Sequence, residues 1–268
     1  MRVNTNPGAL PRVPRAVALG TFDGVHCGHR GLVARAYGTG LVPTVVTFDP
    51  HPRRVLGRAV SLITTLDRRF ELLADAGAAD VLVAAFTEEV ARMSAEDWAE
   101  QVLRPIGTER VIVGEGFRFG VRAAGDADTL RRLGFAVDEL PLQAGASSSR
   151  IRAHIAAGEL AAAAGLLGRP FELEGRATMA PQPGRVHISP EPGTAVPAPG
   201  IYAGRALGWP VLATVAGDGP VEVRVAAPVA VRCPVLLRVE LPCDAVTSPP
   251  GPSRLGRLSH PFVYGMAS

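Results

Sequence analysis

The chain has 268 residues, of which 47% are hydrophobic and 20% charged, the composition of a folded globular protein and not of a disordered one. The net charge is only +3 and no arginine cluster follows one helix face, so the sequence lacks the footprint of a nucleic-acid-binding protein. All 28 basic residues are arginine, which excludes Schiff-base chemistry and a P-loop lysine and leaves arginine, histidine, backbone N–H groups or a metal ion for binding phosphate.

Short apolar runs alternate with helical patterns from about residue 15 to residue 167. This alternation predicts a Rossmann-like α/β domain whose parallel sheet is covered on both faces, with ligands bound beyond the carboxyl ends of the strands. Strands are predicted over 16–22, 43–49, 79–86, 109–117 and 135–142, and helices over 29–39, 66–77, 94–106 and 126–134.

The character of the chain changes after residue 171. Eight prolines lie between Pro181 and Pro220, and the helical pattern gives way to short β-like runs separated by turn residues. Such runs predict a small barrel or sandwich. We therefore expect a first domain over 1–168, a small β-barrel-like domain over 169–247 and a flexible tail over 248–268. The predicted strands of the second domain are 171–179, 185–190, 200–207, 210–216, 221–227 and 234–241.

The cysteines and the N-terminus indicate the compartment. Cys27, Cys233 and Cys243 form no CxxC pair and no even framework, and residues 1–15 lack the apolar core of a signal peptide. No apolar run approaches the roughly 20 residues needed to span a bilayer. These features predict a cytoplasmic protein with small-molecule partners, without a membrane or nucleic-acid partner, and they leave the oligomeric state open.

The stretch GTFDGVHCGH (20–29) places His26 and His29 at the start of a predicted helix, directly after a strand. Gly20 and Gly24 permit a tight turn there. A helix N-terminus attracts anions, so histidines at this position suit phosphate chemistry. Two alternatives are metal ligation, which lacks further His, Cys or Glu at metal spacing nearby, and ordinary core histidines.

Three further loops follow predicted strands or open a helix. TFDPHP (47–52) is stiffened by two prolines and offers the polar groups of Asp49 and His51, although a structural turn explains it equally well. SSSRIR (147–152) combines hydroxyl, N–H and guanidinium groups suited to a polyphosphate, or else forms a serine N-cap with solvent-exposed arginines. VGEGFRFG (113–120) is a weaker signal, in which Arg118 and the backbone face the same crevice.

These four motifs, followed by LGRPF (167–171), resemble the bacterial bifunctional riboflavin kinase/FMN adenylyltransferases, also called FAD synthetases. The adenylyltransferase half of that family belongs to the HxGH nucleotidyltransferases, and the resemblance covers roughly residues 15–171. It implies a nucleotidyltransferase of FAD biosynthesis, in which the phosphate of FMN attacks the α-phosphorus of ATP to give FAD and pyrophosphate. Other nucleoside triphosphates stay open, and positioning and charge stabilisation carry such a transfer.

The resemblance also implies roles for individual residues. Mg²⁺ would shield the triphosphate with ligands mostly from phosphate and water, so no protein ligand is assigned to it. The implied catalytic residues are His26, His29 and Arg150. The implied nucleotide-binding residues are Gly20, Thr21, Phe22, Gly28, Gly114, Ser147, Ser148, Ser149 and Arg152. The implied acceptor-binding residues are Asp23, Asp49, His51, Phe117 and Arg118.

The chain departs from the family pattern in both halves. The family commonly has Asp or Asn where this chain has Gly116, and a basic residue near Gly145. In the second half, Val211 and Ala213 replace the Thr and Asn of the kinase motif PTAN, although Glu222 matches the kinase's glutamate. We therefore expect no riboflavin kinase activity, and a barrel that packs on the first domain or helps bind the acceptor.

Two alternative functions stay open. The first keeps the chemistry but nucleotidylates another phosphorylated metabolite, as the two glycines and the altered second domain suggest. The second is a non-catalytic flavin-nucleotide binding protein. Pyrophosphate release with FMN, with another acceptor or with neither distinguishes the three functions.

Overall fold

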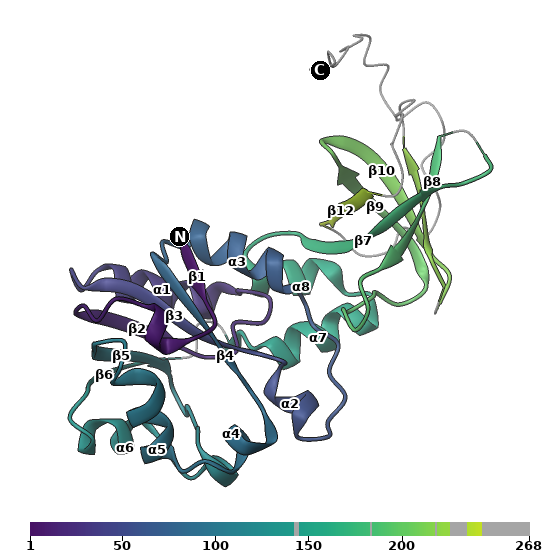
Figure 1. Cartoon of the computed structure of the whole chain (residues 1–268). Helices are drawn as coiled ribbons and strands as arrows, with labels where there is room; N and C mark the ends of the chain where they lie inside the picture. Colours follow the sequence, from purple (N-terminus) through teal and green to yellow (C-terminus); the bar gives the residue numbers. More distant parts are fainter. Residues whose placement is uncertain (142–144, 183, 218, 226–234, 243–268) are drawn as a thin grey trace.

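The computed structural model describes residues 1–141, 145–182, 184–217, 219–225 and 235–242, which form a sheet domain followed by a barrel (Figure 1). The sheet has the strand order β1-β4-β3-β2-β5-β6, and every neighbouring pair is parallel. Its strands are β1 (Arg2–Asn4), β2 (Arg15–Leu19), β3 (Val42–Asp49), β4 (Asp80–Ala85), β5 (Thr108–Gly114) and β6 (Ala136–Leu140).

Helices cover both faces of this sheet, as the alternating sequence pattern predicts. Side chains of β2 alternate between the two faces: Ala16 and Ala18 pack toward α1 (Cys27–Tyr37) and α3 (Leu66–Asp75). Val17 and Leu19 pack on the other face, toward α5 (Ala95–Trp98), the π-helix η2 (Ala99–Leu103) and α6 (Ala127–Arg132). Shorter segments are η1 (Pro7–Ala9), α2 (Pro52–Val55), α4 (Glu88–Arg92) and η3 (Val121–Ala123).

The second domain is a closed antiparallel barrel with the strand order β10-β11-β8-β7-β12-β9, so of the two predicted architectures the barrel is confirmed and the sandwich is wrong. Closure removes the exposed sheet edges that a sandwich keeps. Its strands are β7 (Phe171–Met179), β8 (Arg185–Pro190), β9 (Gly200–Ala206), β10 (Trp209–Val215), β11 (Val221–Val225) and β12 (Val235–Leu241).

Two helices connect the domains. The buried faces of α7 (Ser148–Ala157) and α8 (Leu160–Leu167) share one apolar cluster with the barrel interior. Ile151 and Leu160 therefore pack with barrel residues such as Tyr202, whose hydroxyl donates to the Ala198 carbonyl at 2.7 Å. The domain boundary at residue 168 stays a prediction, and the predicted tail lies outside the described residues.

Several predicted boundaries need correction. The strand predicted over 16–22 ends at Leu19, and the strand predicted over 109–117 ends at Gly114. The backbone leaves the sheet at a glycine in both cases, Gly20 and Gly114. The helix predicted over 94–106 is α5 followed by η2, and it ends at Leu103. The wider turn of η2 keeps Ala99 and Leu103 buried together with Trp98.

Candidate active site

The loop between β2 and α1 carries the two histidines of the first motif. His26 is the N-cap residue of α1, one position before the first helical turn, and its Nδ1 accepts from the His29 backbone N–H at 3.4 Å. The two imidazole rings stack with centroids 3.6 Å apart, and the Phe22 ring lies 4.8 Å from His29. A Cβ on Gly28 would lie 3.2 Å from the His26 ring. The absence of a side chain at position 28 therefore leaves room for this ring to pack against the start of the helix.

Both histidines are neutral near pH 7. Burial, together with the positive charges of Arg30 and Arg169, lowers the pKa of His26 to about 4. Burial also lowers the pKa of His29 well below its ordinary value, with smaller contributions from His26 and Arg69. Because Nδ1 of His26 accepts a hydrogen bond, the proton of this neutral ring is assigned to Nε2, which can donate to an anionic oxygen.

His29 has a free polar atom. Its Nδ1 is buried, and within the described part of the chain it has no hydrogen-bond partner. A buried ring nitrogen without a partner is costly unless a ligand or water satisfies it. The arrangement therefore offers a hydrogen-bonding atom to a bound molecule at the N-terminus of α1.

Asp23 holds the first motif to helix α7. Its carboxylate is fully buried, Oδ1 accepts from the Ile63 N–H at 2.9 Å, and Oδ2 pairs with Nη1 of Arg152 at 2.6 Å. The Ser148 hydroxyl donates to the Asp23 carbonyl at 2.9 Å. In this structure the charged groups of Asp23 and Arg152 therefore bind each other, and their predicted roles toward acceptor and nucleotide stay predictions.

The start of α7 presents the other groups of the third motif. Ser147 caps the helix by accepting from the Arg150 N–H at 3.2 Å, as the serine N-cap alternative predicts. The Ser149 hydroxyl accepts from Nη2 of Arg152 at 3.3 Å. Arg150 is exposed. A Cβ on Gly145, which has a φ of +66°, would lie 2.9 Å from Nη1 of Arg150.

The second motif lies at the end of β3, beside the first. The Thr47 hydroxyl donates to the Thr21 carbonyl at 2.9 Å, and the Gly20 N–H donates to the Val46 carbonyl at 3.2 Å. Asp49, the last residue of β3, is exposed. His51 is buried and caps α2, and burial followed by the charge of Arg152 lowers its pKa to about 4.

The fourth motif is organised differently. Gly114 ends β5, and the Phe117 ring stacks on Phe119 at 5.5 Å. Arg118 pairs with Asp126 at 2.8 Å on the surface, so its guanidinium is already occupied. Gly116 has a φ of +71°, a conformation that Asn and Asp also tolerate, and a Cβ there would meet nothing within 4 Å.

Sequence reasoning missed Arg69. This residue of α3 is 1% exposed, donates to the Phe48 carbonyl at 3.4 Å, and is close enough to Asp23 and Asp49 for both to stabilise its charge. Its Nε has no hydrogen-bond partner among the residues that the structure describes. A usable signal was present, because position 69 is three residues after Leu66 and so falls within the apolar stripe of the helix.

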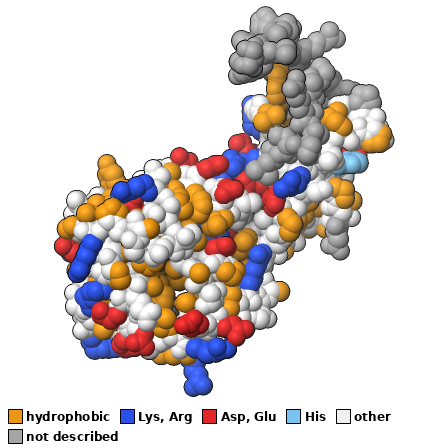
Figure 2. Space-filling model, in the orientation of Figure 1, with side chains coloured by type: hydrophobic (Ala, Val, Ile, Leu, Met, Phe, Trp, Pro, Cys, Tyr) orange, Lys and Arg blue, Asp and Glu red, His pale blue; other side chains and the backbone are white. Residues whose placement is uncertain are grey.

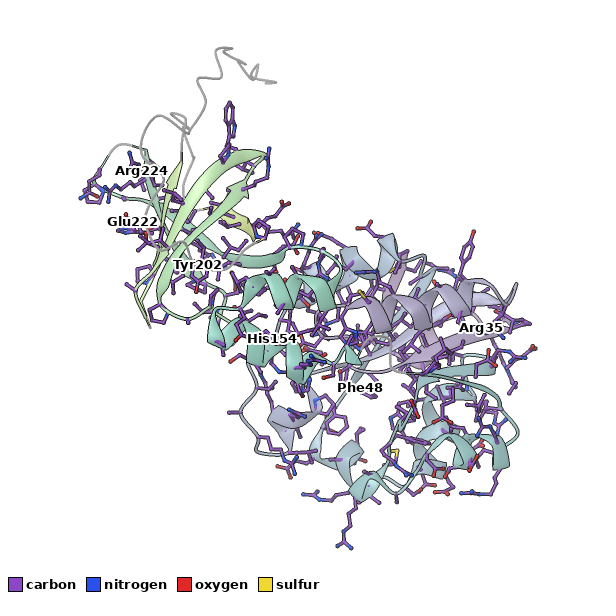
Figure 3. All side chains as sticks on the ribbon, turned by 180° about the vertical axis from the view of Figure 1, so that it is seen from behind. Arg35, Phe48, His154, Tyr202, Glu222 and Arg224 are labelled. Carbon is purple, nitrogen blue, oxygen red and sulfur yellow. The ribbon has the colours of Figure 1, made fainter. Side chains whose placement is uncertain are left out.

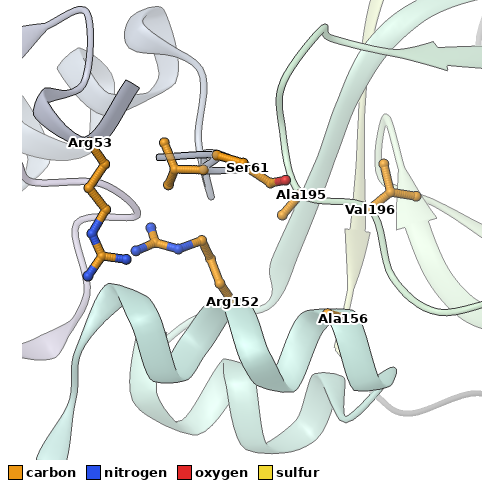
Figure 4. A pocket seen from close by; sticks show the side chains of 8 residues that line it. Arg53, Ser61, Arg152, Ala156, Ala195 and Val196 are labelled. Carbon is orange, nitrogen blue, oxygen red and sulfur yellow. The ribbon is translucent and has the colours of Figure 1, made fainter. Parts of the chain in front are cut away.

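A pocket of about 200 Å³ lies next to the Asp23–Arg152 ion pair, and the guanidinium groups of Arg53 and Arg152 face the same space (Figure 4). Ligand pockets commonly have about 300–1,000 Å³, so it holds part of a dinucleotide at most. The lining comes from both domains: Arg53, Ala59, Val60, Ser61, Arg152, Ala156, Ala195 and Val196.

Within the described residues, no three or more His, Cys, Asp and Glu side chains are grouped so as to hold a metal ion. No helix in the same part of the chain is both long and apolar enough to cross a membrane.

A family model and several known proteins are similar to this chain in sequence. The FAD synthetase family model matches residues 12–150. The bifunctional riboflavin kinase/FMN adenylyltransferase of Listeria monocytogenes is 30% identical over 211 residues, which are 71% of this chain and 67% of the relative. The protein of the same description from Pseudomonas fluorescens is 30% identical over 236 residues, 77% of this chain and 76% of the relative. That from Escherichia coli K12 is 29% identical over 223 residues, 76% and 71% of the two chains.

One solved structure covers nearly the whole fold. A protein described as a macrolide-efflux protein from Streptococcus pneumoniae superposes with a TM-score of 0.82 over 92% of this chain and 93% of its own. The two sequences are 20% identical, so this likeness concerns the fold alone.

Proposed function

The chain belongs to the FAD synthetase family, and from that premise we propose that it transfers the adenylyl group of ATP to the phosphate of FMN, forming FAD and pyrophosphate. An oxygen of the FMN phosphate forms the new bond to the α-phosphorus. The bond from this phosphorus to the bridging oxygen breaks, and pyrophosphate leaves with the electron pair. The observation that carries the proposal is the stacked, neutral pair His26 and His29 at the N-terminus of α1.

The two histidines act as hydrogen-bond donors to the oxygens of the transferring phosphoryl group. Because the rings are neutral, they do not bind the ground-state substrate as tightly as a charged imidazolium would. Their hydrogen bonds strengthen as negative charge develops on the phosphoryl oxygens in the transition state. The free N–H groups at the start of α1 add to this stabilisation. Preorganised donors of this kind are each worth about 10²–10³ in rate in other enzymes.

The start of α7 binds the β- and γ-phosphates. Arg150 is exposed there, and Ser147 and Ser149 place hydroxyl groups on the same helical turn. Mg²⁺ fits this site as an ion carried by the triphosphate. Asp23 is a carboxylate within the loop between β2 and α1, which we call the histidine loop. Both of its oxygens are already engaged, one by a backbone N–H and one by Arg152, so we do not assign it to the ion as a ligand. When bound, the ion neutralises charge on the triphosphate.

The acceptor binds on the other side of Arg152, at the pocket that Arg53 also lines. Two guanidinium groups facing one space favour an anionic group, as the phosphate of FMN is. One observation favours a second candidate, a different phosphorylated acceptor: Gly116 and Gly145 leave no side chain where the family commonly has polar or basic groups.

We infer that the barrel does not phosphorylate riboflavin. Val211 and Ala213, which replace the Thr and Asn of the kinase motif, are buried in the barrel interior on β10 and offer no oxygen or amide to a nucleotide. Glu222 is bound to Arg185 at 2.7 Å. It lies on the barrel with Arg224, away from Phe48 and the sheet domain (Figure 3).

The test is to incubate the purified protein with Mg²⁺, each of ATP, CTP and GTP, and either FMN or riboflavin, measuring pyrophosphate and identifying products by mass. We expect FAD from ATP and FMN. His29→Asn should abolish most of this activity, and His187→Asn on the barrel is the matched control. In parallel incubations with other phosphorylated metabolites in place of FMN, pyrophosphate formed only with one of these acceptors would support the second candidate. Tight FMN binding without pyrophosphate would refute catalysis.

A further inference from the structure

We propose that the barrel is a positioning unit of the adenylyl-transfer site, because it holds the segment Leu62–Arg69, which in turn holds Asp23. We call this segment the bridging segment. It runs into α3 and lies between the two domains, so that residues close in sequence contact the barrel and the histidine loop in turn. The predicted effect on turnover rests on the proposed function, whereas the predicted effect on the loop does not.

The backbone of the bridging segment pairs with the barrel. The Leu62 N–H donates to the Gly193 carbonyl at 2.8 Å, and the Leu62 carbonyl accepts from the Ala195 N–H at 2.7 Å. This is an isolated parallel bridge between a loop of the sheet domain and the loop after β8. It fixes one end of the segment without using any side chain, so its strength depends on the barrel loop staying in place.

Buried carboxylates of β7 hold the start of α3. The Thr65 hydroxyl donates to Glu174 at 2.6 Å, and Arg68 binds Glu172 through two hydrogen bonds of 2.8 and 2.7 Å. The side chains of Glu172 and Glu174 are only 7% and 4% exposed. Buried carboxylates are stable when their partners are in place, so these contacts resist separation of the domains.

A second layer of ion pairs surrounds these carboxylates. Arg238 of β12 binds Glu174 at 2.9 Å and Glu71 of α3 at 3.1 Å. Acidic and basic side chains accordingly gather where the two domains meet (Figure 2). Three elements, α3, β7 and β12, are thereby joined in one charged network.

Residues 63 and 64 of the bridging segment bind the loop between β2 and α1. The N–H groups of Ile63 and Thr64 donate to Oδ1 of Asp23 at 2.9 and 3.4 Å, and the Thr64 hydroxyl accepts from the Gly24 N–H at 3.2 Å. Residues 62, 65 and 68 thus contact the barrel, and residues 63 and 64 contact the loop that carries His26. A shift of the barrel therefore moves the groups that fix Asp23.

Asp23 passes the constraint to α7. Its second oxygen holds Arg152, and Arg152 lines the pocket that we assign to the acceptor. The barrel thus acts on catalysis through Asp23, in addition to lining the same pocket with Ala195 and Val196. This gives a physical role to a domain in which Val211 and Ala213 replace the residues of a kinase.

The test uses the full chain with Glu172→Gln/Glu174→Gln, compared with Glu191→Gln/Glu240→Gln. The control pair also removes two negative charges, from barrel positions whose side chains form no hydrogen bond or ion pair with the described residues of the sheet domain. Glu191 is 3.9 Å from Arg176 of the barrel itself. Hydrogen–deuterium exchange is measured for peptides spanning 20–26 and 61–65, and for β9 and β10 as a report on the barrel fold. The kcat and KM for FMN and the affinity for a non-hydrolysable ATP analogue are also measured.

We expect the first variant to exchange at least tenfold faster over 20–26 and 61–65, with β9 and β10 still protected. Its kcat should fall about tenfold or more while the affinity for the ATP analogue changes less. Exchange or kcat equal to that of the control variant would overturn the proposal. If the double variant loses β9 and β10 protection, Glu172→Gln alone is measured by the same criteria.

Failure of the proposed function is separately visible. A wild-type chain that forms no FAD refutes the proposed reaction. In that case the positioning role is decided by comparing the variant with the wild type in the hydrogen–deuterium exchange of residues 20–26 and in the affinity for the ATP analogue. Unchanged exchange and unchanged affinity in that case overturn it.

Discussion

Lowering the pH from 7.5 to 5 should destabilise the sheet domain, because His26 and His51 are buried in their neutral forms. Each has a pKa of about 4 in the folded chain, against about 6.5 for an unfolded histidine. The unfolded chain therefore takes up protons first as the pH falls. The stability that these groups contribute is complete above about pH 6.5 and is lost progressively toward pH 4.

The size of the effect follows from the two pKa values. At pH 5, linkage gives a loss of about 2 kcal/mol for each histidine, and so about 4 kcal/mol for the pair. His29, whose pKa is also lowered, adds to the same loss. The free energy of unfolding of a domain is commonly about 5–15 kcal/mol, so a domain at the lower end of this range would lose most of its stability at pH 5.

The assay is urea unfolding at pH 7.5, 6 and 5, followed by tryptophan fluorescence. Trp98 is buried in the sheet domain, and Trp209 begins β10 of the barrel, so Trp209→Phe leaves a signal from the sheet domain alone. His26→Asn and His51→Asn keep a side chain that caps a helix but cannot take up a proton.

Each Asn variant should lose about 2 kcal/mol of the difference between pH 7.5 and pH 5, whereas His187→Asn on the half-exposed barrel surface should keep the wild-type difference. A free energy of unfolding that stays constant from pH 7.5 to pH 5 in the wild type would refute the reasoning. So would Asn variants as acid-sensitive as the wild type.

Four further outcomes are expected. Arg152→Met removes the guanidinium that binds the buried Asp23 carboxylate directly and leaves only the nearby charge of Arg69, so it should lower the free energy of unfolding by about 3 kcal/mol in urea titrations; adding Asp23→Asn should restore part of the loss. An undiminished midpoint in the single variant would contradict this. His29→Asn should lower kcat for FAD formation by about 10²-fold with little change in KM for FMN, followed by pyrophosphate release. Riboflavin with Mg²⁺ and ATP should yield no FMN by chromatography, and any FMN formed by the pure protein would show that the barrel is a kinase. Gly168→Ala, at a φ of +67° and with a Cβ that would clash with the Arg30 guanidinium and the Cys27 sulfur of α1, should lower stability by about 1–3 kcal/mol and hence the melting temperature. Gly165→Ala in α8, where nothing lies within 4 Å, should leave the melting temperature equal or higher.

The sheet could be predicted because each strand is a compact apolar run between turn residues. Val45 and Val46 of β3, for instance, pack on opposite faces and so require a layer of helices on each side. Strand β1 was missed because its three residues are mostly exposed. It is held by Arg2 binding Asp80 at 2.7 Å, a contact 78 residues away in the sequence. The helices α2, α4 and α8 were also not predicted, two of them because they are so short.

The candidate site was predictable where motifs follow strand ends, since parallel strands bring their carboxyl ends to one edge. The histidine loop, the end of β3 and the start of α7 do meet there. Arg118 is bound by Asp126, eight residues later, a contact that the motif itself does not predict. The bridging segment carries no motif, and its importance arises only from contacts with Asp23 on one side and Glu174 on the other.

Barrel closure has a consequence for the co-translational folding of the protein. Strand β12 closes the barrel by pairing with both β7 and β9, and among the described strands it is the last to be synthesised. The histidine loop and the bridging segment leave the ribosome some 170 residues earlier, as the difference between residues 235 and 65 gives. Because domains generally fold as the chain emerges, the sheet forms first and its loop is secured only after residue 241 has been made. A truncated nascent chain therefore carries every phosphate-binding motif without the scaffold that aligns them, and synthesis itself sets the moment at which the site matures.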